Sequence, residues 1–150
     1  MKKVVLAFSG GLDTSFCVPY LKNEKGLEVH TVLVNTGGFS KEEAARIEER
    51  ALTLGAASHT TVDAVDTYYN KGLKYLIYGN VLKNNTYPLS VSSERVFQAL
   101  EVLNTVKKIG ADYVAHGSTG AGNDQVRFDI VFEIMAPEVE ILAPIRELEI

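Results

Sequence analysis

The hydrophobic positions of this chain fall into short apolar runs that alternate with longer segments of mixed character. Three runs are short enough and apolar enough to be strands buried on both faces of a parallel sheet. They are Val4–Phe8, Val29–Val34 and Tyr113–Ala115. Two weaker runs, Ala57–Val62 and Val139–Leu142, predict further strands.

The segment Lys41–Leu54 has the signals of a helix at both ends. Ser40 precedes it and Glu43 follows three residues later, which is the pattern of a capping box, and Gly55 comes directly after it. Four apolar residues share one face of this helix: Ala44, Ile47, Ala51 and Leu54. The charged run Lys41–Arg50 is typical of a solvated outer face rather than a partner site.

Three other segments also have helical spacing. In Ser93–Ile109, which is followed by Gly110, the apolar face consists of Val96, Leu100, Leu103 and Val106. In Gln125–Met135 the apolar face consists of Val126, Ile130, Val131 and Ile134. The segment Asp63–Asn85 has tyrosines at helical spacing, and we expect these to pack rather than to bind: Tyr68, Tyr69, Tyr75 and Tyr78.

Strands that alternate with helices predict the α/β fold class, with a Rossmann-like parallel sheet and helices on both faces. A chain of 150 residues is long enough for one domain with a single good core. Its 15 basic and 19 acidic side chains give a net charge of −4, which argues against a general nucleic-acid binder.

The early apolar run is too short to be a membrane span or a secretory signal. The one cysteine, Cys17, excludes an internal disulfide framework and suits a reducing compartment. We therefore expect a soluble, cytoplasmic protein that binds neither nucleic acid nor membrane.

The first candidate ligand loop runs from Ser9 to Ser15, between a predicted strand and a helix. In an open α/β sheet, this junction lies at the carboxyl edge, where ligands bind. Gly10 and Gly11 allow close approach of the backbone, and the hydroxyls and helix-start N–H groups can hold a phosphate. Asp13 could cap the helix, orient a phosphate-bound Mg²⁺, or do both. We favour phosphate binding over a simple tight turn with an N-cap.

This loop resembles the signature of the ATP pyrophosphatases, which split ATP into AMP and pyrophosphate. It differs from the Gly-x-Gly-x-x-Gly of dinucleotide folds and from the Walker loop, since no Gly-Lys-Ser/Thr follows. The resemblance implies an adenine nucleotide alpha hydrolase-like fold of the PP-loop type. The superfamily includes GMP synthetase, NAD synthetase, tRNA-modifying enzymes and argininosuccinate synthetase, and the loop alone does not distinguish them.

The second candidate loop begins the segment His116–Phe128, which also follows a predicted strand, so both loops can face one crevice. Taken singly, Asn123 and Asp124 could be helix caps and Arg127 a surface arginine. Together with Thr119 they offer an amide, a carboxylate, a guanidinium and a hydroxyl within nine residues. That mixture suits zwitterionic amino acids, whose ammonium needs an acceptor and whose carboxylate suits an arginine fork.

This second segment closely resembles the motif of argininosuccinate synthetases, and Tyr87–Ser92 and Ala143–Arg146 match that family in position. The resemblance implies an ATP-driven ligation. The ureido oxygen of citrulline attacks the α-phosphorus of ATP, which gives citrullyl-AMP and pyrophosphate. The amine of aspartate then displaces AMP to form argininosuccinate. Such chemistry needs positioning and charge neutralisation more than a covalent nucleophile.

The resemblance also implies roles for individual residues. The residues expected to bind ATP are Ala7, Phe8, Ser9, Gly10, Gly11, Leu12, Asp13, Thr14, Ser15, Val34, Ala115, His116, Gly117, Ser118, Thr119, Gly120, Ala121, Gly122 and Asn123. Those expected to hold citrulline are Tyr87, Ser92, Asn123 and Arg127. Those expected to hold aspartate are Thr119, Asn123 and Asp124. We expect Asp13, Asp124 and Arg127 to be catalytic, with Mg²⁺ bound by the ATP phosphates and by Asp13. One departure is Ala121, which stands where many family members have lysine.

Two alternatives stay open from the sequence. One is another PP-loop ATP pyrophosphatase, of the tRNA-modifying or amidotransferase type, and the other is a non-enzymatic ATP-binding module. Members of the resembled family are much longer, with a second domain that completes the citrulline site and mediates tetramer assembly. We expect residues 1–150 to be the nucleotide-binding domain without that second domain, and therefore to be inactive alone. The full-length enzyme is expected to be a homotetramer.

Overall fold

The computed structural model describes residues 1–149, except for the side chain of Val91. Its main feature is a five-stranded sheet in the order β3-β2-β1-β6-β7, in which every pair of neighbours is parallel. The strands are β1 Lys3–Ala7, β2 Glu28–Asn35, β3 Ser58–Asp63, β6 Tyr113–Ala115 and β7 Glu140–Leu142. All five expected strands are therefore present, including the two weaker ones.

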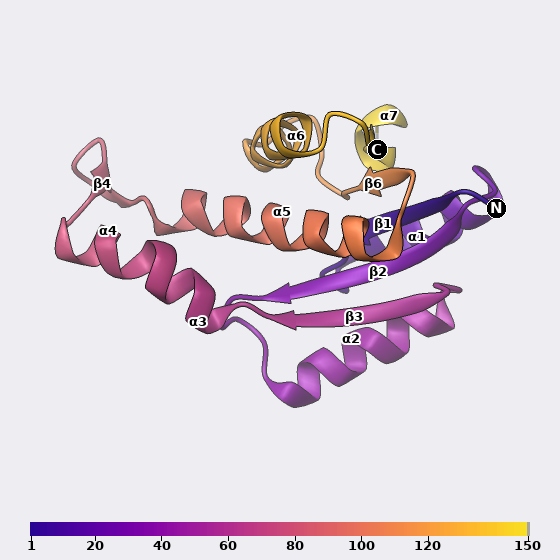
Figure 1. Ribbon diagram of the computed structural model, residues 1–150, viewed down its shortest axis with the longest axis horizontal. Coiled ribbons are helices and arrows are strands. Elements are labelled where there is room, and N and C mark those ends of the chain that lie inside the picture. The colour runs from indigo at the N-terminus through magenta and orange to yellow at the C-terminus, as the bar shows by residue number, and fades with distance from the viewer. Residues whose placement is uncertain (150) are drawn as a thin grey trace.

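Helices cover both faces of this sheet (Figure 1). The helices that pack on it are α1 Leu12–Asn23, α2 Lys41–Thr53, α5 Ser90–Ile109, α6 Asp124–Met135 and the short α7 Pro144–Glu147. The capping box of α2 forms as expected, because Ser40 Oγ accepts from Glu43 N and Glu43 Oε2 accepts from Ser40 N. The α/β fold with two covered faces is thereby confirmed.

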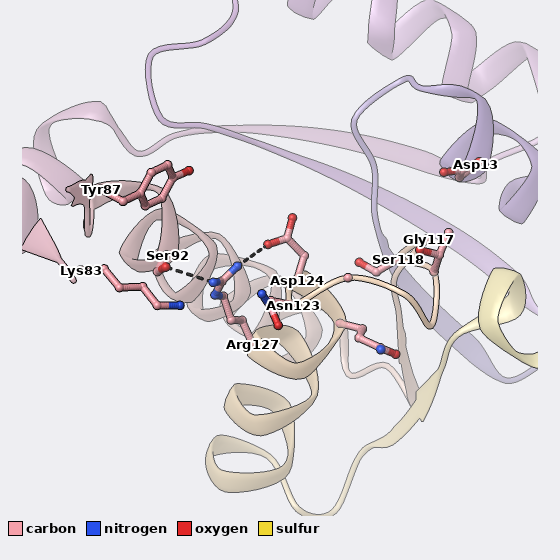
Figure 2. A pocket seen from close by; sticks show the side chains of 12 residues that line it. Asp13, Lys83, Tyr87, Ser92, Gly117, Ser118, Asn123, Asp124 and Arg127 are labelled. Atoms are coloured by element: carbon pink, nitrogen blue, oxygen red, sulfur yellow. Dashed lines mark hydrogen bonds and ion pairs between the residues drawn. The ribbon is translucent and has the colours of Figure 1, made fainter. Parts of the chain in front are cut away.

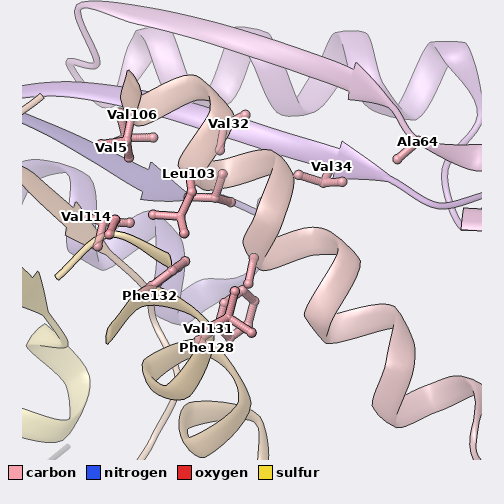
Figure 3. Close-up of a cluster of buried hydrophobic side chains, with 13 residues drawn as sticks. Val5, Val32, Val34, Ala64, Leu103, Val106, Val114, Phe128, Val131 and Phe132 are labelled. Atoms are coloured by element: carbon pink, nitrogen blue, oxygen red, sulfur yellow. The ribbon is translucent and has the colours of Figure 1, made fainter. Parts of the chain in front are cut away.

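The core consists of two clusters, one on each face of the sheet. The alternation of side chains along β1 shows the division: Val5 belongs to the cluster under α5 and α6, whereas Val4 and Leu6 belong to the cluster under α1, α2 and α7. Figure 3 shows the first cluster, which includes Leu103, Val114 and Phe132. Strands buried on both faces account for the continuous apolar runs in the sequence.

The apolar face predicted for α6 is wrong for three of its four residues. Val126, Ile130 and Ile134 are 48%, 49% and 71% exposed, and the helix instead buries Phe128, Val131 and Phe132. Because α6 is apolar around most of its circumference, periodicity alone does not select one face. On α5, Val96 is likewise half-exposed, whereas Ala99 and Val102 are buried.

Between β3 and α5, the chain forms an arm that lies away from the sheet, at the N-terminal end of α5 (Figure 1). It consists of α3 Val65–Tyr68, a π-helical turn Tyr69–Leu73, α4 Lys74–Tyr78, and the antiparallel strands β4 Leu82–Lys83 and β5 Tyr87–Pro88. The packing expected for its tyrosines holds only for Tyr68, whose ring meets Phe97 at 5.2 Å between centroids. The other three tyrosines of the arm are exposed: Tyr69 by 45%, Tyr75 by 60% and Tyr78 by 78%.

Within residues 1–149, no helix is long and apolar enough to span a membrane. Cys17 is fully buried on α1, and this burial raises the pKa of its thiol to about 12. Cys17 therefore packs in the core cluster under α1, α2 and α7.

Candidate functional site

The first glycine loop connects β1 to α1 in a conformation that needs glycine. Gly10 has φ +75°, and a Cβ on it would lie 2.9 Å from Cγ1 of Ile47 on α2. Gly11 is the N-cap of α1 and provides no side-chain hydrogen bond to the first turn. The capping role considered for Asp13 is therefore wrong, since Asp13 lies inside the first turn and its side chain is exposed. The amide groups of this helix start are available to an anion.

Helix α2 supports this loop from behind. Arg50 Nη1 donates a hydrogen bond to the carbonyl oxygen of Gly10 at 2.7 Å. Arg50 is exposed, as predicted for the charged run Lys41–Arg50, and it also supports the first loop. The sequence did not reveal this contact because the two residues are 40 positions apart.

The second glycine loop follows β6, the neighbour of β1 in the sheet, and touches the first loop. A Cβ on Gly117 would lie 2.9 Å from Thr14 Cγ2 and 3.3 Å from Thr14 N. Only glycine therefore allows this approach. The two loops meet at the carboxyl ends of adjacent strands, as their positions in the sequence predicted.

Two cavities open beside the paired loops. The larger, about 570 Å³, reaches from the first loop over the ends of β1 and β2 to α5. The smaller, about 490 Å³, extends from the second loop to the arm, and Figure 2 shows Tyr87 and Lys83 on one side of it and Asp13 on the other. Four residues line both cavities: Asp13, Gly117, Ser118 and Asp124. The cavities are therefore contiguous along the second loop.

Most residues predicted to bind ligands line one of these cavities. In the larger cavity are Ala7, Phe8, Ser9, Gly11, Leu12, Asp13, Thr14, Val34, His116, Gly117 and Ser118. In the smaller cavity are Tyr87, Ser92, Thr119, Gly122, Asn123, Asp124 and Arg127. Five predicted residues line neither: Gly10, Ser15, Ala115, Gly120 and Ala121. Ser15 Oγ is buried and has no hydrogen-bond partner among the described residues.

Ion pairs set the shape of the smaller cavity. Arg127 Nη1 donates to Asp124 Oδ1 at 2.7 Å, and Arg127 Nη2 donates to Ser92 Oγ at 3.0 Å (Figure 2). The other carboxylate oxygen of Asp124 accepts from Arg95 Nε at 3.1 Å. The reading of Arg127 as a mere surface arginine is therefore wrong. So is the reading of Asn123 as a side-chain cap, because it makes no cap hydrogen bond to α6.

One polar wall of the larger cavity was not expected from the sequence; it consists of Thr36, Glu94, Arg95 and Gln98. Glu94 Oε1 accepts from Thr36 Oγ1 at 2.5 Å, and Gln98 Oε1 accepts from Arg95 Nη1 at 2.8 Å. Three of these residues, Glu94, Arg95 and Gln98, lie within two turns of α5 and look, in the sequence, like its solvent-facing side. The only signal was their i, i+1, i+4 spacing, which any amphipathic helix shows.

A family model described as arginosuccinate synthase N-terminal HUP domain matches residues 3–150. The chain belongs to the argininosuccinate synthase family. It is 48% identical over 148 residues to the argininosuccinate synthase of Xylella fastidiosa, covering 99% of this chain and 36% of that protein. It is 46% identical over 144 residues to that of Saccharolobus solfataricus, covering 96% of this chain and 36% of that protein. The chain thus spans only about a third of the length of these synthases.

Solved structures with low sequence identity share the fold of this chain. One is NMN synthetase from Francisella tularensis, with TM-score 0.60, 12% identity, and coverage of 79% of this chain and 46% of that one. Another is a predicted tRNA methyltransferase subunit from Methanocaldococcus jannaschii, with TM-score 0.58, 21% identity, and coverage of 97% and 69%. At these identities they support the fold alone. The predicted fold class, a Rossmann-like parallel sheet of the adenine nucleotide alpha hydrolase-like type with helices on both faces, is confirmed.

Proposed function

We propose that this chain provides the ATP site and part of the amino-acid sites of an argininosuccinate synthase. The enzyme would ligate citrulline and aspartate, with ATP converted to AMP and pyrophosphate through citrullyl-AMP. The observation that carries this proposal is the pair of contiguous cavities at the two contacting glycine loops. One cavity suits a nucleotide, the other suits an amino acid, and they share the residues at which the two substrates would react.

The larger cavity fits ATP in both size and chemistry. Val34 and Val102 provide apolar surface for a base, while Glu94 and Gln98 provide polar groups for specific hydrogen bonds. The glycine loop before α1 presents backbone N–H groups to the phosphates. Gly11, which lines this cavity, has no side chain to block the approach of a phosphate.

Mg²⁺ would enter with ATP rather than occupy a site built by the protein. Among the described residues, no three His, Cys, Asp or Glu side chains gather into a metal-binding group. The exposed carboxylate of Asp13 borders both cavities. One carboxylate combined with phosphate oxygens and water is a usual environment for Mg²⁺.

The smaller cavity fits the two amino acids. Arg127, oriented by Ser92 and Asp124, can present its guanidinium fork to the carboxylate of citrulline, next to Tyr87. Asp124 and Thr119 offer acceptors to the ammonium group of aspartate. The ureido oxygen and the α-phosphorus would meet where Asp13, Ser118 and Asp124 border both cavities.

We further propose that residues 1–150 act as the nucleotide-binding domain of a longer cytoplasmic chain. A second domain would complete the citrulline site and assemble the enzyme as a homotetramer. The support is the share of its relatives that this chain spans, 36%. Light scattering on a longer chain that includes these residues would test the tetramer.

The test of the substrates is calorimetric titration of this chain. We expect it to bind Mg-ATP, and to bind citrulline more tightly when a non-hydrolysable ATP analogue is present. Binding of Mg-ATP with no response to citrulline at any concentration would instead favour a simple ATP-binding module. If wild-type protein binds neither, the proposed function is wrong.

A further inference from the structure

A chain of polar side chains connects α7 to the second glycine loop through α6. It starts at Arg146, whose Nη1 donates both to Asp129 Oδ2 at 2.5 Å and to Gln125 Oε1 at 3.1 Å. Asp129 and Gln125 lie one turn apart on α6. From these two residues, two branches run to the loop that connects β6 to α6.

The first branch passes through His116, which is only 1% exposed and stacks on Phe128. His116 Nε2 lies 2.9 Å from Asp129 Oδ1, and the Ser118 N–H donates to His116 Nδ1 at 3.2 Å. A backbone N–H can only donate, so Nδ1 must carry a lone pair. The proton of the neutral ring therefore belongs on Nε2, where it is donated to Asp129.

The second branch passes through Gln125, whose Nε2 donates to the carbonyl oxygen of Gly120 at 2.6 Å. The loop needs such help from side chains. Among the described residues, no backbone–backbone hydrogen bond outside the helices and strands involves residues 117–122. A loop without bonds of its own keeps one shape only if other groups satisfy its backbone.

We propose that Arg146, Asp129, His116 and Gln125 are positioning residues that hold the second glycine loop in its ligand-binding shape. Gly117 and Ser118, which line both cavities, would keep their places because His116 holds the Ser118 amide. From the sequence, His116 was expected to bind ATP. In this proposal its ring instead affects ATP binding indirectly, because it holds the loop that lines the cavities. The effect of this network on ATP binding rests on the proposed function, whereas the network itself does not.

The charges around His116 favour the neutral ring that the network requires. Burial lowers the pKa of His116, and the nearby charge of Arg146 lowers it further, while Asp129 and Glu147 oppose this change. Burial by itself would raise the pKa of Asp129, but hydrogen bonds from Arg146 and His116 lower it overall. At neutral pH, a carboxylate thus accepts from both Arg146 and a neutral imidazole.

The geometry is tested by NMR without ATP. In the wild type we expect ¹⁵N imidazole spectra to show His116 neutral and protonated at Nε2 at pH 7. In Arg146→Ala we expect the pKa of His116 to rise, because Asp129 loses its other partner, and the Ser118 amide to exchange faster. The matched control is Arg46→Ala, an exposed arginine of α2. A ring protonated at Nδ1, or unchanged Ser118 exchange in Arg146→Ala, would overturn the proposal.

The effect of the network on ligand binding is tested by Mg-ATP titration of two folded variants. His116→Asn keeps an acceptor near the position of Nδ1, whereas His116→Leu fills similar space without one. We expect His116→Asn to retain most of the affinity for Mg-ATP. We expect the affinity of His116→Leu to be about tenfold lower, because one positioning contact is lost. Equal affinities for the two variants would contradict the proposal. If wild-type protein does not bind Mg-ATP, the proposed function fails, and the NMR result still decides whether the network holds the loop.

Discussion

Asp13 illustrates how a single side chain can be read in two ways until its neighbours are known. It lies in the first turn of α1, where a carboxylate is favoured by the helix dipole whatever its function. The structure shows that it makes no cap and borders both cavities. A carboxylate that is exposed at this place is free to meet a metal ion bound to phosphates.

We predict that Asp13→Asn weakens binding of Mg-ATP and leaves the fold intact. The amide keeps the shape of the side chain but removes the charge that attracts the cation. Calorimetry with Mg-ATP, and with ATP alone, measures the effect. Asp66→Asn, at another exposed aspartate in the first turn of a helix, is the matched control and should change neither affinity. Unchanged Mg-ATP affinity in folded Asp13→Asn would contradict a metal role.

A second prediction for a single residue concerns Arg127. In a longer enzyme that includes these residues, Arg127→Ala should raise the KM for citrulline much more than the KM for ATP. A charge-assisted hydrogen bond contributes roughly 1.5–3 kcal/mol, so an increase of about tenfold or more is expected. Steady-state kinetics with each substrate varied in turn gives the comparison. Equal increases for both substrates would indicate that Arg127 chiefly maintains the structure through Asp124 and Ser92.

At the scale of elements, the site depends on contacts between loops and the helices behind them. The first loop rests on α2 through Ile47 and Arg50, and the second rests on the first through Gly117 and Thr14. Each loop is short and has little regular structure of its own. Its shape is therefore set by elements that are distant in the sequence.

We predict that Gly117→Ala separates the two loops and lowers Mg-ATP affinity by about tenfold or more. The added methyl group would lie 2.9 Å from Thr14 Cγ2, so one loop must move. The matched control is Gly120→Ala, where the nearest atom, Arg146 Cγ, is 3.8 Å away. Isothermal titration of both variants measures the difference. Equal affinities would mean that the loops do not need this close contact.

At the scale of the whole molecule, two histidines make stability depend on pH. Burial lowers the pKa of His116 and of the partly buried His59 below the usual 6.5. Between 6.5 and the lower folded values, the unfolded chain binds more protons, so stability falls as pH falls. The depressed pKa of Asp129 acts in the same direction, but at a more acidic pH.

We predict that the free energy of unfolding decreases as pH falls from about 7.5 to about 5, the range set by the histidine pKa near 6.5. Urea unfolding at a series of pH values measures it. In His116→Asn the decrease should be smaller, because one of the two groups is absent. A slope that is unchanged in this variant would show that His116 does not titrate differently on folding.

The prediction of widest scope is that this 150-residue chain binds ATP but does not make argininosuccinate. Both glycine loops follow strands of one sheet, and the side chains that hold them, Arg50, His116 and Gln125, belong to this chain. The smaller cavity, in contrast, is bordered by an exposed arm, where Tyr87 is 48% exposed. A nucleophile that is held at one end only loses much of the rate advantage of proximity. That advantage can lower the reaction barrier by roughly 7–11 kcal/mol.

A pyrophosphate-release assay with ATP, citrulline and aspartate tests this prediction. Turnover by the purified chain at an ordinary enzymatic rate, ~1 s⁻¹ or faster, would contradict it. The positive control is a longer chain that contains the same residues. The expected result is turnover by the longer chain, and ATP binding without turnover by the 150-residue chain.

The sequence by itself determined those features that depend on near neighbours along the chain. Short apolar runs predicted all five strands, and the Ser40–Glu43 pair predicted the start of α2. The two glycine loops predicted where the cavities lie, because loops that follow parallel strands meet at one edge of the sheet. Backbone propensity and periodicity are local properties, so one sequence suffices to recognise them.

Only the tertiary structure decided which face of α6 is buried and which arginines serve the site. Phe128 and Phe132 face the core because α5 lies above that part of the sheet, whereas the hydrophobic pattern of α6 fits several faces. Arg50 and Arg146 look like surface charges in the sequence, yet one holds Gly10 and the other holds the second loop through α6. Such contacts join residues 17 to 40 positions apart. They exist only once the crossover helices have packed on the sheet, which no local pattern specifies.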